Sequence, residues 1–142
     1  MHLRRPVAVG ARAVKTRTLA ESFRCAARGL LYVLATQRNF RIHCAAGAGV
    51  ILAAFLWNVP RTEFILLILT TAAVLVAEIM NTSIETIVDM VSPAYHPLAA
   101  VAKNVAAGAV LVTAAGAIVV ALLVFGGKLC ELGVSIFRIG WK

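Results

Sequence analysis

The chain has 142 residues, of which 61% are hydrophobic and only 14% are charged. This composition excludes an ordinary soluble domain and predicts one small all-α membrane domain. The formal net charge is +8, and seven of the 14 basic residues lie between Arg4 and Arg28. A basic segment beside apolar helices is typical of contact with anionic lipid headgroups, and no nucleic-acid-binding signature accompanies it. The three cysteines form no CxxC pair and are interpreted as small buried hydrophobes.

The first part of the chain is predicted to be a flexible arm. Residues 1–19 are basic, contain Pro6 and Gly10, and show no clear periodicity. A signal peptide would need an apolar core directly after its charges. The first long apolar run begins only at Cys44, so we expect this basic flexible N-terminal arm to be retained.

Residues 20–36 are predicted to form an amphipathic surface helix. Arg24 and Arg28 lie one turn apart, whereas apolar residues recur on another side at spacings of three and four. The apolar positions are Phe23, Ala26, Ala27, Leu30, Leu31 and Leu34. Leucines facing acyl chains and arginines facing headgroups are typical of a helix in the membrane interface. The alternative is a solvated helix that packs on the transmembrane bundle.

Three transmembrane helices are predicted at about 40–59, 64–91 and 98–126, followed by a C-terminal tail at 128–142. Together with the surface helix they make up a membrane domain at 20–127. At about 1.5 Å per residue the second span is about 42 Å long, which exceeds the roughly 30 Å of hydrocarbon. Its last turns must therefore emerge from the membrane.

The distribution of basic residues predicts the orientation. The positive-inside rule places the basic N-terminus in the cytoplasm. With three spans, the turn near Pro60 and the C-terminus then lie outside, and the loop at 92–104 lies in the cytoplasm. The emerging turns of the second span are therefore expected on the side where ATP is found.

The second predicted span carries a stripe of polar side chains. At about 100° per residue, Glu78, Asn81, Glu85 and Asp89 fall within an arc of about 80°. Ionisable residues in a membrane segment are candidates for function by default. The alternative for Glu78 is a carboxylate that pairs with a basic residue to fix helix packing. For Glu85 and Asp89 the alternative is a solvated helix end.

The stripe and the nearby Lys103 contain the groups that phosphoryl transfer needs. Paired carboxylates at a membrane surface suit Mg²⁺, which prefers few carboxylates together with phosphates. Lys103 can neutralise phosphate oxygens, unless it is an interfacial anchor. The deeper Glu78 is placed to accept a proton from a lipid hydroxyl. These parts predict transfer from MgATP, without a Walker A or kinase-type glycine-rich loop.

The chain resembles the small trimeric integral-membrane kinases of the prokaryotic diacylglycerol kinase and undecaprenol kinase family. The resemblance covers roughly residues 22–125 and rests on RNFRIH at 38–43, EIMNTSIETIVD at 78–89 and HPLAAVAK at 96–103. It implies a homotrimer of three-span subunits with shared active sites at the cytoplasmic face of the bacterial inner membrane. The implied reaction transfers the γ-phosphate of MgATP to undecaprenol or diacylglycerol, and the first and third blocks favour undecaprenol.

The resemblance also implies roles for individual residues. Glu78 corresponds to the catalytic base, which contacts the lipid substrate, and Glu85 corresponds to a ligand of the metal and the nucleotide. The remaining nucleotide-site candidates are Asn81, Asp89, His96, Lys103 and Asn104, with a turn residue as the alternative for His96. Two positions depart from the family pattern. Gln37 stands where the enteric-type enzyme has a second metal-ligating glutamate, and Asn104 stands where an acidic residue usually follows the lysine. Gln37 can still offer a carbonyl oxygen to Mg²⁺.

A second class of function fits the same stripe. A small proton-coupled membrane transporter could use Glu78 as its carrier carboxylate. However, the acidic residues cluster at one end of the spans, and three spans do not divide into inverted repeats. The kinase hypothesis is therefore favoured.

Overall fold

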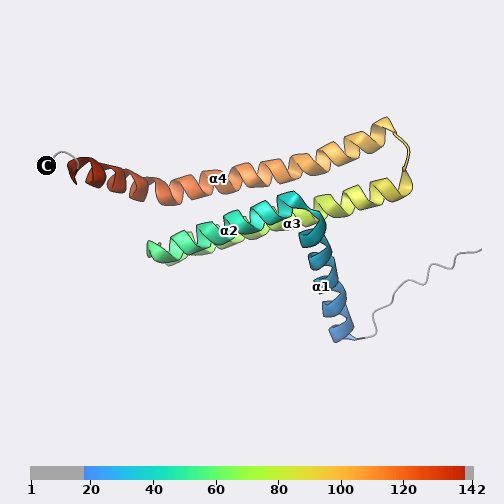
Figure 1. The fold of residues 1–142 in the computed structure, drawn as a ribbon, viewed down its shortest axis with the longest axis horizontal. Helices are drawn as coiled ribbons and strands as arrows, with labels where there is room; N and C mark the ends of the chain where they lie inside the picture. Colours follow the sequence, from blue (N-terminus) through green and yellow to red (C-terminus); the bar gives the residue numbers. More distant parts are fainter. Residues whose placement is uncertain (1–17, 140–142) are drawn as a thin grey trace, which may run out of the picture.

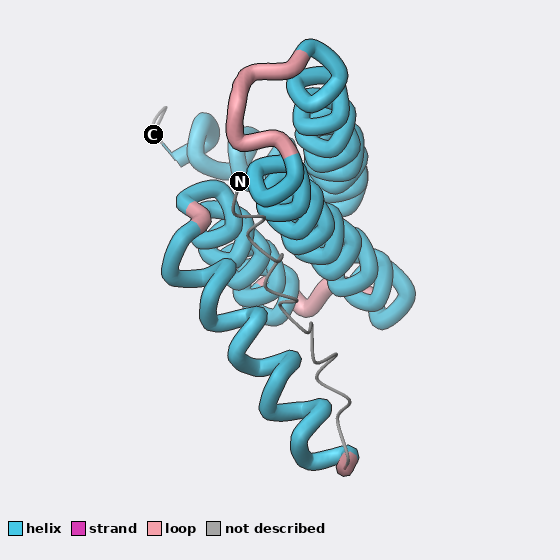
Figure 2. The backbone as a smooth tube through the Cα atoms, turned by 90° about the vertical axis from the view of Figure 1, so that its right-hand side faces the viewer, coloured by secondary structure: helices cyan, strands magenta, loops and turns pink. Residues whose placement is uncertain are grey.

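The computed structural model describes residues 18–139, with side chains described for 18–128, and forms four α-helices (Figure 1). They are α1 (Leu19–Thr36), α2 (Arg38–Leu56), α3 (Arg61–Val91) and α4 (Pro97–Ile139). Three segments are long and apolar enough to cross a membrane, namely Arg38–Leu56, Arg61–Val91 and Pro97–Lys128. The predicted all-α fold with three candidate spans after a first helix is thus confirmed. Figure 2 shows the short loops that join the helices.

The start of α1 is fixed by a capping box. The Thr18 hydroxyl accepts a hydrogen bond from the Glu21 backbone N–H at 3.2 Å, and the Glu21 carboxylate accepts one from the Thr18 N–H at 3.2 Å. These bonds satisfy two of the N–H groups that a helix start leaves unpaired. The arm predicted at 1–19 lies outside the described residues, except for Thr18 and Leu19.

The apolar side of α1 is not covered by the other helices of the chain. Leu19, Phe23 and Leu31 are 79%, 75% and 63% exposed, and Val33 is the residue of α1 that is buried. Figure 1 shows α1 projecting sideways from the α2–α3–α4 bundle. A helix that packed on the bundle would bury this side, so the arrangement favours the surface-helix interpretation. Cys25 is exposed, so the prediction of buried cysteines is wrong at that position.

The α3 and α4 helices run antiparallel and keep one register along their length. Lys103 forms an ion pair with Asp89 at one end, and Phe125 packs in a core cluster with Leu67 at the other. The two contacts are 22 residues apart on both helices, from 67 to 89 on α3 and from 103 to 125 on α4. Because both helices rise by the same amount per residue, intermediate positions face each other in the same register.

Aromatic and basic side chains close the bundle near the α2–α3 turn. The rings of Trp57 and Phe125 meet edge to face at a centroid distance of 5.4 Å. The Lys128 ammonium donates a hydrogen bond to the Trp57 carbonyl oxygen at 2.8 Å. Tryptophan and lysine are typical of the membrane–water interface. This end of the bundle therefore provides a reference level from which membrane depth can be counted.

The count places the second membrane boundary near the α1–α2 bend. About 20 helical residues cross the hydrocarbon region. When about 20 residues are counted from Trp57, Arg61 and Lys128, the far boundary lies near residue 37 on α2, residue 81 on α3 and residue 108 on α4. By this count, the last turns of α3 and the first turns of α4 extend beyond the boundary. Helix α4 also continues through Ile139, past the end predicted at 126, because the segment contains no proline to break it.

The closest approach of α2 to α3 depends on a glycine. A Cβ atom added at Gly47 would lie 2.4 Å from the Thr71 Cγ2 atom, whereas one added at Gly49 would meet nothing within 4 Å. Small residues at such contacts let membrane helices approach closely.

We expect Gly47→Val to destabilise the fold by about 1–3 kcal/mol, because the added methyl groups must push Thr71 and α3 away. Gly49→Val is the matched control, since it makes the same change in helix propensity on the same helix. Denaturant unfolding in detergent micelles measures both. Equal stability of the two variants would contradict the close contact.

Candidate active site at the membrane boundary

Helix α3 carries the candidate site on its packing face. Its buried residues are Leu67, Val74, Glu78 and Thr82, which follow one another at spacings of seven, four and four. Such spacings keep side chains on one side of a helix. Because α3 is continuous from Arg61 to Val91, the polar stripe predicted from the sequence continues the line of apolar core residues toward the membrane boundary.

The carboxylate of Glu78 is buried and unpaired. Glu78 is 3% exposed, and its side chain makes no hydrogen bond or ion pair with any residue of the described part of the chain. The neighbouring Thr82, 4% exposed, donates its hydroxyl hydrogen to the Glu78 backbone oxygen at 3.0 Å and not to the carboxylate. Buried ionisable groups are normally paired, and an unpaired one requires an explanation. The alternative of a packing salt bridge for Glu78 finds no basic partner among residues 18–128, whose side chains the structure describes.

Asn81 and Glu85 form a polar pair one turn further along the stripe. The Asn81 Nδ2 atom donates a hydrogen bond to Glu85 Oε1 at 3.1 Å. The Asn81 Oδ1 atom is buried and has no hydrogen-bond partner. An amide oxygen without a donor can accept a hydrogen bond or bind a cation, and Glu85 retains a second carboxylate oxygen.

Asp89 and Lys103 join α3 to α4 beyond the boundary. The Lys103 ammonium donates to Asp89 Oδ1 in an ion pair whose side chains are 35% and 65% exposed for lysine and aspartate. An exposed pair of this kind contributes only about 0.2–1 kcal/mol. A ligand phosphate could therefore attract Lys103 at little cost, and the pair meanwhile holds both side chains at one level.

The remaining candidates lie around this pair or at the α1–α2 bend. His96 is exposed, and its Nδ1 atom accepts a hydrogen bond from the Leu98 N–H at 3.2 Å at the start of α4. Asn104 is exposed beside Lys103. Gln37 is half-buried between α1 and α2, and its side-chain amide donates to the Thr36 hydroxyl at 3.5 Å. The structure thus gives His96 a capping role in the turn and leaves its Nε2 atom available.

The site does not contain a complete metal centre of its own. Within residues 18–128 no three His, Cys, Asp or Glu side chains are grouped to hold a metal ion. Mg²⁺ commonly takes one or two carboxylates and completes its shell with waters and phosphates. The hard oxygens of Glu85 and the unpartnered Asn81 carbonyl fit a cation that arrives together with a nucleotide.

The candidate groups follow one another along α3 from the lipid side to the water side of the boundary. Glu85 lies about 10 Å and Asp89 about 16 Å from Glu78 along the α3 axis. Glu78 lies just inside the boundary near residue 81, whereas Glu85, Asp89 and Lys103 lie beyond it. A proton acceptor in the membrane edge therefore lies next to groups that suit an anionic, water-soluble ligand.

Sequence analysis missed one residue that positions the site. The Arg41 guanidinium donates hydrogen bonds to the backbone oxygens of Leu34 at 3.2 Å and Ala35 at 3.0 Å. These carbonyls belong to the last turn of α1, which has no basic residue of its own. Arg41 thus fastens α1 across the extended Gln37, whose φ is −99° and ψ is 112°. The available signal was a cation shortly after a predicted helix end.

Fold and site together define a small three-span membrane protein with a candidate phosphoryl-transfer site at one end of its bundle. A family model described as prokaryotic diacylglycerol kinase matches residues 24–125, which include all candidate site residues, the first two candidate spans and the third span up to Phe125. The chain belongs to this family.

Two curated relatives support the assignment. The chain is 47% identical over 103 residues to a diacylglycerol kinase of Synechocystis sp. The aligned region covers 72% of this chain and 59% of the relative. The chain is also 38% identical over 109 residues to an undecaprenol kinase of Bacillus subtilis. That aligned region covers 77% of this chain and 89% of the relative. These matches give no support to the transporter alternative.

We expect Arg41→Met to loosen α1 from the bundle. The variant keeps the apolar stem but removes hydrogen bonds worth about 1 kcal/mol, so other α1 orientations should be populated roughly fivefold more. Spin labels at Ala27 and Ala48 in a cysteine-free background report the change as a broader distance distribution. Arg38→Met is the control, because Arg38 makes no side-chain hydrogen bond within the described chain. Identical distributions for the two variants would contradict the role of Arg41.

Proposed function

We propose that this protein is an ATP-dependent lipid kinase that transfers the γ-phosphate of MgATP to the hydroxyl of a membrane lipid alcohol. Family membership supports the reaction class. The observation that carries the assignment to a site is the buried, unpaired Glu78 carboxylate, located on the same helix face as the polar groups beyond the boundary.

Glu78 acts as the general base for the lipid hydroxyl. A lipid alcohol holds its hydroxyl near the membrane boundary, at the level of this carboxylate. As the hydroxyl oxygen forms its bond to the γ-phosphorus, its proton passes to Glu78, and the bond between the γ-phosphorus and the bridging oxygen of ADP breaks. Because no other side chain of the described chain donates a hydrogen bond to the carboxylate, the carboxylate can accept one from the substrate hydroxyl.

The groups beyond the boundary bind the nucleotide. Lys103 contacts phosphate oxygens after exchanging Asp89 for the ligand, and the remaining nucleotide contacts come from Asn81, Glu85, Asp89, His96 and Asn104. Glu85 would hold Mg²⁺, with the Gln37 carbonyl oxygen as a second ligand. When bound, Mg²⁺ neutralises charge on the transferring phosphate.

The substrate is inferred to be undecaprenol or diacylglycerol. The two relatives carry the names of these activities. The RNFRIH and HPLAAVAK blocks favour undecaprenol. Parallel phosphorylation of the two alcohols in the same lipid mixture decides between them.

The working enzyme is inferred to be a homotrimer in the bacterial cytoplasmic membrane. Asp89, His96 and Asn104 are exposed in the single chain, so a neighbouring subunit is needed to enclose a bound nucleotide. Arg24, Arg28, Arg38 and Arg41 lie at the end of the bundle that carries the site. The positive-inside rule therefore supports a cytoplasmic site and contact of α1 with anionic headgroups.

We expect Glu78→Gln to lower lipid phosphorylation by about 10²–10⁴-fold, because the amide cannot accept the hydroxyl proton. Transfer of labelled γ-phosphate to lipid measures the loss, and chemical cross-linking shows whether the trimer persists. Glu63→Gln is the control, since it makes the same change in the first turn of α3 at the opposite end. Normal turnover of Glu78→Gln would refute the base assignment.

We expect Gln37→Glu to lower the Mg²⁺ concentration needed for half-maximal activity, because it adds a carboxylate ligand. Gln37→Leu, which offers no side-chain oxygen, should raise that concentration. Activity is titrated with Mg²⁺ at saturating ATP and lipid. If the three titration curves coincide, Gln37 is not a metal ligand.

A further inference from the structure

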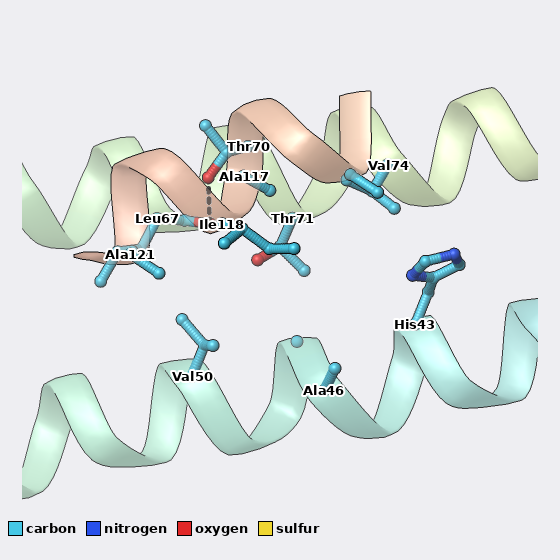
Figure 3. A pocket seen from close by; sticks show the side chains of 12 residues that line it. His43, Ala46, Val50, Leu67, Thr70, Thr71, Val74, Ala117, Ile118 and Ala121 are labelled. Atoms are coloured by element: carbon cyan, nitrogen blue, oxygen red, sulfur yellow. Dashed lines mark hydrogen bonds between the residues drawn. The ribbon is translucent and has the colours of Figure 1, made fainter. Parts of the chain in front are cut away.

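A cavity that is open on one side lies between α2, α3 and α4 in the membrane-spanning part of the bundle (Figure 3). Its volume is about 210 Å³. Small side chains create the space, because α4 contributes Ala114, Ala117 and Ala121 and α2 contributes Ala46 and Gly47. None of these residues belongs to the candidate site described above.

The wall of the cavity suits hydrocarbon. Apart from His43, Thr70 and Thr71, all lining residues are apolar or glycine. The Thr70 hydroxyl is already engaged, since it donates to the backbone oxygens of Leu66 at 2.9 Å and Leu67 at 3.2 Å. A water molecule needs two to four polar partners to be stable in a cavity. This wall offers few, so an apolar occupant fits better.

The cavity leads toward Glu78. Val74 lines it, and Glu78 follows Val74 by one turn on the same buried face of α3. The register of α3 and α4 also places the cavity beside Glu78. Glu78 lies 11 residues before Asp89, and the lining residue Ala114 lies 11 residues after Lys103, so Glu78 and Ala114 are at the same level of the bundle. Figure 3 shows His43 near Val74 at one end and Ala121 near Leu67 at the other. From Val74 to Leu67 the cavity follows α3 for about 10 Å away from Glu78.

We propose that this cavity holds the part of the lipid alcohol's hydrocarbon tail that lies next to the reacting hydroxyl. The inference rests on the proposed function, because it takes Glu78 as the contact of that hydroxyl. A hydroxyl at Glu78 is attached to a chain that must continue toward the middle of the membrane. The cavity lies in that direction, and its lining residue Val74 precedes Glu78 by one turn on the buried face of α3.

The proposal assigns substrate selection to the small residues of the wall. A chain that enters the bundle is held against α2, α3 and α4, which fixes the distance of its hydroxyl from Glu78. A chain that remains in the surrounding lipid would have no such constraint. Filling the cavity should therefore weaken binding of long-chain alcohols and leave ATP binding unchanged.

The first test fills the cavity with Ala117→Leu. We expect the KM for dioleoylglycerol and undecaprenol to rise about tenfold or more, with an unchanged KM for ATP. Phosphorylation of dibutyrylglycerol, whose chains are too short to extend along the cavity, should stay at the wild-type rate. Ala115→Leu is the matched control, because Ala115 is exposed on the same helix and does not line the cavity.

The second test uses the unmodified protein and does not depend on the folding of a variant. A long-chain alcohol with a diazirine in the chain near the hydroxyl is photolysed in the complex, and the modified residues are mapped by mass spectrometry. We expect labels on Thr71, Val74 and Ala117, and loss of these labels in the presence of excess unlabelled alcohol. Labels confined to outward-facing residues such as Leu111 and Leu122 would overturn the proposal.

The outcomes separate this inference from the proposed function. If the wild-type protein phosphorylates no lipid alcohol, the proposed function itself fails. If the wild type is active but Ala117→Leu and Ala115→Leu have the same lipid KM, the chain does not occupy the cavity. If Ala117→Leu alters trimer assembly and no cavity residue is labelled, the space is filled by a second copy of the chain and the inference is wrong.

Discussion

The constant register between α3 and α4 is the constraint on which the rest of the structure depends. Its two ends are marked by the Leu67–Phe125 packing and by the Asp89–Lys103 pair. Because neither helix has a break between these contacts, the level of every side chain relative to the membrane boundary is fixed. A slip of one residue would rotate Glu78 by about 100° around α3 and remove it from the buried face.

Because the register is fixed, one face of α3 holds side chains at defined depths both in the membrane and in water. A carboxylate is costly in the membrane interior, and the same group in water binds substrates weakly because of screening. By running continuously across the boundary, α3 keeps Glu78 in the apolar edge and carries Glu85 and Asp89 into water within about three turns. On the proposed function, the lipid hydroxyl and the nucleotide approach the same stripe from opposite directions, each without leaving its own medium.

The sequence predicted those features that depend on the period of a single helix. The stripe from Glu78 to Asp89, the emergence of the second span and the exposed apolar side of α1 follow from spacing and length. Features that depend on two elements were not accessible in this way. The capture of α1 carbonyls by Arg41, the pairing of Lys103 with Asp89 and the cavity beside Gly47 require the angle and register between helices. Thr18 was missed as a cap because its partner Glu21 was not considered. Thr82 was also missed, although its spacing of four from Glu78 places it on the same face of α3.

On the proposed function, the charge balance of the site makes the two departures from the family pattern compatible with phosphoryl transfer. Glu78, Glu85 and Asp89 are the acidic groups of the stripe, and Lys103 is the cation that pairs with Asp89 across the α3–α4 contact. With Gln37 and Asn104 in place of two further acids, the site repels a nucleotide polyphosphate less strongly, while each amide still offers an oxygen. Because Mg²⁺ completes its shell with phosphate oxygens, a nucleotide can supply the negative ligands that the protein lacks. The unpartnered Asn81 oxygen and the free oxygen of Glu85 are the positions at which such a shared shell would begin.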